Sequence, residues 1–264
     1  MGDFLCYNID IMKGRKKNNK IVLTYYWTGE RDVWHKDIDI YHADPHEFDT
    51  LYDSVFGRGY DFVTLANELY PTADKSKFWK VVGLSGDWEK PKNMSLYVHK
   101  FISCYEYLLK HPEYEEIWIV DSSDTEMMGT PAPEDGIIYG GYDAYAPIFH
   151  QYYPVKYLIG GESDGVWLPG IFMMGHKQDD EIVRYLRALH LEDVAWNCGV
   201  FGGKRAVVME FLEKFVPLLR KTVSDVEMVI YNYVMYRYFS GRSRCITTRM
   251  TLGEKDMTKW WRHK

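Results

Sequence analysis

The feature that most constrains the fold is an alternation of short apolar segments with amphipathic ones. Segments rich in β-branched and aromatic residues cover residues 21–27, 60–65 and 78–84, and a fully apolar one covers residues 117–120. Strands that are apolar on both faces belong to covered sheets, and strands that alternate with helices form parallel sheets. The sequence therefore predicts an α/β fold with a central, mostly parallel sheet flanked by helices.

The clearest helical pattern lies just before the fourth of these strands. After Asn93, which would cap the helix, apolar residues recur at intervals of four and three, as one face of a helix requires, until Pro112 ends the pattern. Four further helices are expected, over residues 46–56, 180–191, 204–221 (kinked at Pro217) and 224–239. The stretch between residues 130 and 175 is rich in Gly, Pro and Tyr and predicts functional loops with small strands.

Composition and charge indicate a single domain. Residues 1–20 form a basic lead-in, and residues 21–264 contain neither an internal repeat nor a linker. A chain of 264 residues with 46% apolar residues suits one α/β unit with a sizeable core. The net charge of -6 argues against a nucleic-acid partner, since such proteins carry a concentrated basic face.

The sequence shows no signal that would send the chain into or across a membrane. No apolar run reaches the ~18 residues of a membrane span. The basic cluster of the lead-in follows the short apolar part, whereas a secretory signal has the reverse order. Cys6, Cys104, Cys198 and Cys245 share no metal-type spacing and indicate free thiols of a reducing compartment. We therefore expect a soluble, cytoplasmic protein without a transmembrane segment.

The segment EIWIVDSSDTEMMG, residues 116–129, carries two carboxylates where the apolar strand ends. Ligands of open α/β sheets bind outside the carboxyl ends of the strands, which is where Asp121 and Asp124 fall. Two such carboxylates would hold Mg²⁺ or Mn²⁺ and leave positions for phosphate oxygens. The small Ser123 would let a diphosphate approach. The alternative is an Asx turn, in which Asp124 caps the turn that follows.

Three motifs, in this order, resemble those of glycosyltransferases with the GT-A fold. IWIVDSSD is similar to a D-x-x-D variant of their metal-binding D-x-D motif. WNCGVFGG (residues 196–203) is similar to a segment that precedes a helix, and SDVEMVIYNYV (residues 224–234) to their D-q-x-x-x-N helix. The resemblance covers the chain from residue 21 onward, except for the middle loops. It implies a Rossmann-like GT-A domain that transfers a sugar from a nucleoside-diphosphate sugar, most frequently a UDP-sugar, to a glycan or other hydroxyl acceptor with Mn²⁺ or Mg²⁺.

On the donor side, the resemblance implies that the end of the first strand borders the nucleotide, at Thr24, Tyr25 and Tyr26. One of the two tyrosines would stack on the base while the other points into the core. Lys100 would pair with the diphosphate, or else face solvent from its helix. His263 would complete the metal site of Asp121 and Asp124. Because the spacing of the two acids in IWIVDSSD departs from the simple D-x-D, Asp121 could instead hold the ribose.

On the acceptor side, the resemblance implies that Asp225 serves as the base in an inverting reaction. The acceptor itself is expected near small, polar and aromatic residues of the second half of the chain: Asn197, Gly199, Asp143 and Trp167. The glycines of WNCGVFGG, Gly199 and Gly202, would allow close approach of the backbone to a ligand. Ser224 and Glu227 form a capping box, which is a sufficient structural account of both residues.

Two other functions remain open from the sequence. DSSDT also resembles the D-x-D-x-T motif of haloacid-dehalogenase-type phosphatases, although its second acid is displaced by one position and it lies far from the first strand. A non-catalytic module that binds nucleotide sugars is the other alternative. GVFGGK is one residue short of the phosphate-binding G-x-x-x-x-G-K pattern and is rejected as such. A sugar nucleotidyltransferase is disfavoured because no Gly-rich, Arg-containing loop follows the first strand.

Overall fold

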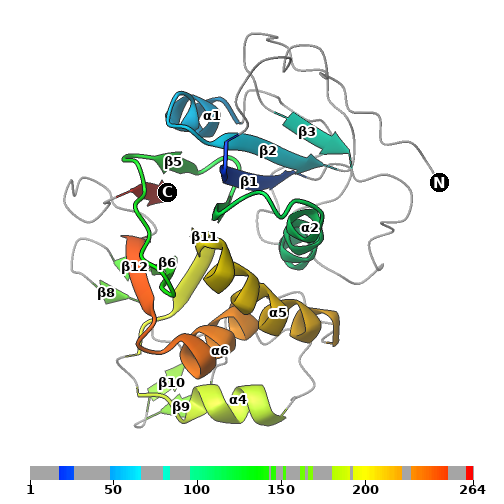
Figure 1. Cartoon of the computed structure of the whole chain (residues 1–264). Coiled ribbons are helices and arrows are strands. Elements are labelled where there is room, and N and C mark those ends of the chain that lie inside the picture. The colour runs from blue at the N-terminus through cyan, green and yellow to red at the C-terminus, as the bar shows by residue number, and fades with distance from the viewer. Residues whose placement is uncertain are drawn as a thin grey trace.

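A seven-stranded sheet organises the part of the chain that the computed structural model describes, which is residues 18–26, 48–66, 80–83, 96–142, 144–146, 151–152, 161–163, 166–168, 180–190, 193–221, 227–248 and 260–263. Its order is β12-β6-β11-β4-β1-β2-β3 (Figure 1). In chain order the strands are β1 (Lys20–Tyr26), β2 (Asp61–Ala66), β3 (Lys80–Gly83), β4 (Glu116–Val120), β6 (Ile138–Tyr142), β11 (Trp196–Lys204) and β12 (Ser243–Thr248).

The strand directions make this sheet mostly parallel. Strand β1 runs parallel to both β2 and β4, β2 runs parallel to β3, and β6 runs parallel to β12. Only β11 is reversed among these strands, being antiparallel to β4 on one side and to β6 on the other. The predicted α/β class with a mostly parallel central sheet flanked by helices is therefore confirmed.

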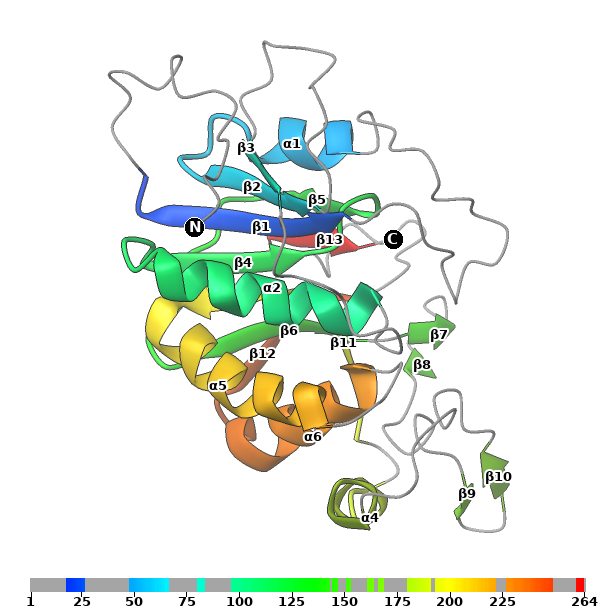
Figure 2. The same ribbon diagram turned by 90° about the vertical axis from the view of Figure 1, so that its right-hand side faces the viewer.

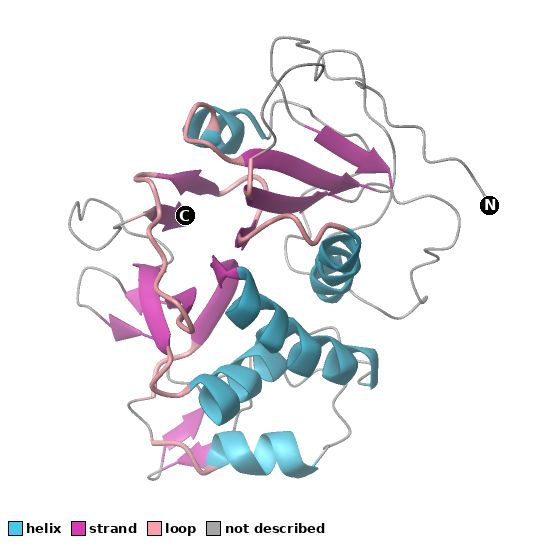
Figure 3. Cartoon of the chain, viewed as in Figure 1, coloured by secondary structure: helices cyan, strands magenta, loops and turns pink. Residues whose placement is uncertain are grey.

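Helices cover both faces of the sheet. Helices α2 (Leu96–Lys110), α5 (Arg205–Lys221) and α6 (Glu227–Phe239) lie together on one face, in front of the sheet in Figure 2. Helix α1 (Asp49–Val55) lies on the other face, so in Figure 3 the strands of the large sheet separate it from those three helices.

Shorter elements surround this framework. Strands β5 (Thr125–Met127) and β13 (Trp261–His263) pair antiparallel on the side of α1. Helix α4 (Asp180–Arg187) packs against α6. Two further antiparallel pairs consist of short strands: β7 (Ala144–Ala146) with β8 (Gln151–Tyr152), and β9 (Gly161–Ser163) with β10 (Val166–Leu168).

Alternation along the central strands divides the buried residues between two clusters. In β4, Ile117 and Ile119 face α2, α5 and α6, whereas Trp118 and Val120 face α1 and β13. Every residue of β4 is buried. Because both faces of the sheet are covered, β4 is apolar from Ile117 to Val120 instead of alternating with polar residues.

Most predicted elements are present with small shifts of their ends. The strands expected at residues 21–27, 60–65, 78–84 and 117–120 correspond to β1, β2, β3 and β4, and the expected helices to α1, α2, α4, α5 and α6. Strand β12 and the pairing of β5 with β13 had no counterpart among the predictions. Residues 1–17 of the expected lead-in lie outside the described residues, and Lys20, its last residue, begins β1.

The described residues also bear on the predictions about the cysteines and about membrane-spanning helices. Cys104, Cys198 and Cys245 are free thiols, as the sequence suggested. Within the ranges given above, none of the helices has the length and apolar character that crossing a bilayer requires.

Candidate metal centre

The acidic pair lies where the strand order of the sheet changes direction. From β1, the chain adds β2 and β3 on one side and β4 on the other. The carboxyl ends of β1 and β4 therefore flank the crevice in which open α/β sheets bind ligands. Asp121 directly follows Val120, the last residue of β4, and Asp124 directly precedes β5.

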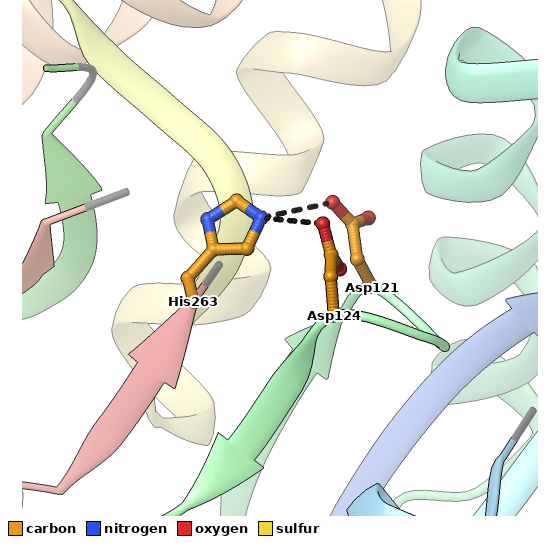
Figure 4. Close-up of side chains that lie close together, drawn as sticks. All are labelled: Asp121, Asp124 and His263. Carbon is orange, nitrogen blue, oxygen red and sulfur yellow. Dashed lines mark ion pairs between the residues drawn. The ribbon is translucent and has the colours of Figure 1, made fainter. Parts of the chain in front are cut away.

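Three side chains from two distant parts of the sequence converge at this point (Figure 4). His263 Nε2 lies 3.2 Å from Asp124 Oδ2 and 3.6 Å from Asp121 Oδ2. One ligand atom from each residue can be chosen so that all three lie within 4.8 Å of one another. The sequence predicted this combination, and the structure brings its three members together.

His263 reaches the centre because the end of the chain forms a strand. In the antiparallel pair, His263 lies opposite Thr125 and Trp261 lies opposite Met127. Trp261 is fully buried, and its ring centroid lies 5.7 Å from that of Trp118. This segment is therefore docked, and the His263 side chain is only 2% exposed.

Gly199 of β11 forms the wall of the centre opposite the strand ends. Its carbonyl oxygen accepts a hydrogen bond of 2.8 Å from the backbone N–H of Asp121. A Cβ atom on Gly199 would lie 2.2 Å from His263 Cε1, 2.6 Å from His263 Nε2 and 2.7 Å from Asp121 Oδ2. Only glycine lets β11 pass this close to the imidazole and the carboxylate.

The donor set fits a divalent cation. Two carboxylate oxygens and one imidazole nitrogen are ligands for Mn²⁺ and related metals. Adjacent ligands about 2.1 Å from a metal in octahedral geometry are about 3 Å apart, close to the separations of His263 Nε2 from the two carboxylates. Neither ring nitrogen of the buried His263 has a partner with hydrogen-bond geometry among the described residues, although Nε2 lies within ion-pair distance of both carboxylates. A cation bound between the imidazole and the carboxylates would satisfy Nε2.

Lys100, from the second turn of α2, supports the first carboxylate. Its ammonium lies 2.6 Å from Asp121 Oδ1 and donates a second hydrogen bond, of 3.3 Å, to the carbonyl oxygen of Cys198. The Lys100 side chain is 5% exposed, so the alternative of a solvent-facing lysine is wrong. Burial alone would lower the pKa of Lys100, but the charge and hydrogen bond of Asp121, together with Cys198 and Glu227, outweigh burial and hold this pKa above its ordinary value. Asp121 thus presents Oδ1 to Lys100 and Oδ2 to the centre.

One acid beside the centre, Glu227, was not among the predicted site residues. It is the first residue of α6 and is only 6% exposed, and Cys198 Sγ donates a hydrogen bond of 3.4 Å to its Oε1. Burial raises the pKa of Glu227 to about 7. Burial also raises the pKa of the Cys198 thiol well above its ordinary value. An acid at the start of an otherwise apolar helix was the available signal, but the capping-box pattern accounted for it.

The residues expected to border the nucleotide are all buried in the core. Thr24 donates a hydrogen bond of 3.0 Å to the carbonyl oxygen of Val120. The hydroxyl of Tyr25 lies 2.7 Å from His99 Nδ1, and the Tyr26 ring packs edge-on against Phe48 at 4.7 Å between centroids. The two tyrosines face opposite sides of the sheet, as alternation predicted, and stacking of either on a base stays a prediction.

The remaining predicted residues are distributed unevenly. Ser123 is exposed in the loop after β4, while Asn197 is 5% exposed and accepts the N–H of Gly199 at 2.7 Å. Trp167 belongs to β10, and its side chain lies outside the described residues. Asp143 and Asp225 also lie outside them.

The centre thus combines a buried histidine, two half-exposed carboxylates, a buried lysine and a glycine wall at one edge of the sheet. This set can bind a divalent cation and leaves the solvent side of the carboxylates open to an anionic ligand. Neither a scan against protein-family models nor a search of curated proteins finds a match for this chain, so the case for a function depends on the centre itself.

Proposed function

We propose that this protein is a divalent-metal-dependent glycosyltransferase. Its donor would be a nucleoside-diphosphate sugar, with UDP-sugars as the first choice, and its acceptor a hydroxyl group of a glycan or small molecule. The observation that carries the proposal is the meeting of Asp121, Asp124 and His263 at the point where the strand order changes. A diphosphate held by metal at that crevice agrees with the general position of ligands in open α/β sheets and with the resemblance of the three motifs.

In this proposal the chain's own residues hold and orient the leaving group. Asp121, Asp124 and His263 would bind the cation, which when present supplies positive charge to the departing diphosphate. Because His263 adds a nitrogen ligand and Mg²⁺ prefers oxygen, Mn²⁺ is the first cation to test. Lys100 orients Asp121 through their 2.6 Å contact and adds positive charge to the same region. Asp225, which lies outside the described residues, stays the predicted base on the strength of the resemblance alone.

The test is a panel of nucleoside-diphosphate sugars, each measured for thermal stabilisation with and without Mn²⁺. A ligand that binds the native state raises its apparent stability, by about 2.7 kcal/mol at a hundredfold excess over Kd. We expect one base and one sugar to stabilise the protein, and only with the metal. Stabilisation that is the same without Mn²⁺ would contradict the proposal.

A variant of the second carboxylate links binding to turnover. Asp124→Ala should abolish metal-dependent turnover of the donor while leaving the fold intact, because Asp124 lies in a loop and its side chain is 33% exposed. Full activity in this variant would refute the metal role. Release of phosphate from simple esters would favour the phosphatase alternative, and binding of a nucleotide sugar without transfer or hydrolysis would favour the binding module.

A further inference from the structure

Strand β11 extends beyond the end of its neighbour β4. It pairs with β4 over Val200–Lys204, and the last bond on this side joins the N–H of Asp121 to the carbonyl oxygen of Gly199. On its other side, the register with β6 shifts between Asn197 and Phe201. Such irregularities are common next to active sites, where they redirect the backbone. The part of β11 that lines the metal centre therefore lacks a regular ladder.

A side chain of α6 adds hydrogen bonds at Trp196, which β4 does not reach and which lies opposite Tyr142 of β6, just before the irregular stretch. Asn232 of α6 accepts the N–H of Trp196 at 2.8 Å through Oδ1 and donates to the carbonyl oxygen of Trp196 at 2.9 Å through Nδ2. This exchange of both bonds is what a neighbouring antiparallel strand would provide. Asn232 Nδ2 also donates to the carbonyl oxygen of Met228 at 2.8 Å, and the residue is 0% exposed.

The other hydrogen bonds of the Trp196–Gly199 backbone are made beside the metal centre. The carbonyl oxygen of Cys198 accepts a bond from Lys100, and the N–H of Gly199 is bound by the side chain of Asn197. Asn232 fixes the first residue of the segment, and Asp121 and Lys100 hold its other end. Since Gly199 has no space to move toward His263, the path of the backbone between these two anchors decides whether the centre forms.

We propose that Asn232 is a positioning residue for the metal centre, acting through the Trp196–Gly199 segment although it touches neither the metal ligands nor the crevice. This inference rests on the proposed function, because it concerns the same centre. It differs from a purely structural role, in which loss of Asn232 would lower stability without a specific effect on Asp121 or on metal binding.

The test compares Asn232→Leu and Asn232→Ser with a matched control at the other end of β11. Arg205, which directly follows Lys204, also makes three hydrogen bonds, to the carbonyl oxygens of Leu108, His111 and Tyr114. Arg205→Met removes these bonds far from the metal centre. Two quantities are measured: the Kd for Mn²⁺, and the hydrogen exchange of the Asp121 amide without metal, because that amide donates to Gly199.

We expect both Asn232 variants to bind Mn²⁺ about tenfold to a hundredfold more weakly, the range seen when residues that orient metal ligands are replaced. The Asp121 amide should exchange faster in both, whereas Arg205→Met with a similar loss of Tm should change neither quantity. Asn232 variants that match Arg205→Met in both measurements would overturn the inference.

Two controls keep the outcome decisive. If the unchanged protein does not bind Mn²⁺, the proposed function fails, and the exchange of the Asp121 amide alone decides the role of Asn232. If neither Asn232 variant folds, exchange in the unchanged protein decides: Mn²⁺ should slow exchange of the Trp196 amide, since binding and the order of this segment are linked. A Trp196 amide insensitive to bound Mn²⁺ would then overturn the inference.

Discussion

At the scale of single residues, two glycines of β11 make room for different neighbours. Gly199 faces His263 and Asp121, whose side-chain ends can shift. A Cβ atom on Gly202 would lie 2.4 Å from Trp118 Cε3 and 2.5 Å from the carbonyl oxygen of Ile117, which are parts of the core and of the backbone. One glycine therefore makes room for the metal centre, and the other for the packing of β11 on β4.

Alanine substitutions should separate these two uses. Gly199→Ala should displace the His263 ring and abolish Mn²⁺ binding with a small loss of stability. Gly202→Ala should cost about 1–3 kcal/mol of unfolding free energy, as overpacking of a core does, while the remaining folded protein still binds Mn²⁺. Urea unfolding and Mn²⁺ titration of both variants check this, and the reverse assignment of the two effects would contradict it.

The two carboxylates of the centre should also differ in their effect on folding. Asp121→Ala leaves the buried Lys100 without its carboxylate, which costs about 3–5 kcal/mol when a buried pair is broken. The 30% exposure of Asp121 shifts the expected value to the lower end of this range. Asp124→Ala should cost less than about 1 kcal/mol, as substitutions outside such pairs do.

A double variant that removes the charges of both Lys100 and Asp121 is the control for this difference. In metal-free buffer, Lys100→Met combined with Asp121→Asn should recover part of the stability lost in Asp121→Ala, since no buried charge is then left unpaired. If Asp121→Ala and Asp124→Ala are equally stable, the ion pair does not contribute to folding.

At the scale of elements, successive residues of the short strand β13 have different roles. Trp261 and His263 point inward and are 0% and 2% exposed, while Arg262 lies between them and pairs with Glu126 near the surface. The side-chain alternation of a strand thus places one anchor and one metal-facing residue on the same side.

Replacement of these neighbouring residues should give opposite results. Trp261→Ala should cost about 3–5 kcal/mol, as the loss of a large buried aromatic side chain does, and should weaken Mn²⁺ binding because His263 loses its anchor. Arg262→Ala should cost no more than about 1 kcal/mol, the usual contribution of an exposed ion pair, and leave Mn²⁺ binding unchanged. Equal Mn²⁺ affinity in both variants would mean that docking of β13 is not needed for the centre.

The elements that the sequence predicted are those with a local signal. Strand β4 is apolar from Ile117 to Val120 because both of its faces are covered, and α2 shows a clear helical period. Strand β12, with the sequence SRCITT, lies at the edge of the sheet and has no such signal. The reversed direction of β11 depends on the path of the whole chain, so no local pattern could show it.

The candidate site follows the same rule. Asp121 and Asp124 were predictable because they form a local motif at a strand end. The contact of His263 with them depends on the pairing of β13 with β5, which joins residues more than a hundred positions apart. The burial of Lys100 was undecided, since a helical period does not tell how many faces of the helix are covered. Glu227 was assigned to a cap because its packing against Cys198 comes from another element.

At the scale of the whole molecule, three buried ionisable groups from different elements lie together behind the metal centre. Lys100, Cys198 and Glu227 come from α2, β11 and α6 and lie on the side of the sheet that α2, α5 and α6 cover. Of these three groups, Glu227 titrates near neutral pH, since burial raises its pKa from 4.5 to about 7.

This shift predicts how stability changes with pH. Between pH 4.5 and about 7 the folded protein binds more protons at Glu227 than the unfolded chain does, so this residue's contribution is full below pH 4.5 and is lost as the pH rises through 7. With about 1.4 kcal/mol for each pKa unit, the loss is at most about 3 kcal/mol. Glu227→Gln should remove this slope.

Urea unfolding at pH 5 and pH 8, in the presence of a chelator, checks the prediction. The unfolding free energy of Glu227→Gln relative to the unchanged protein should be higher at pH 8 than at pH 5. Parallel stability profiles of the two proteins would show that Glu227 does not titrate in this range.

A segment joined after Lys264 would follow His263, whose imidazole faces the two aspartates, by two positions in the sequence. A polyhistidine purification tag at that end would offer several competing imidazoles to the same cation, and its own affinity for metals would mask that of the protein. Fusion at the amino-terminal end avoids this interference and is the appropriate design for any preparation in which metal content is to be measured.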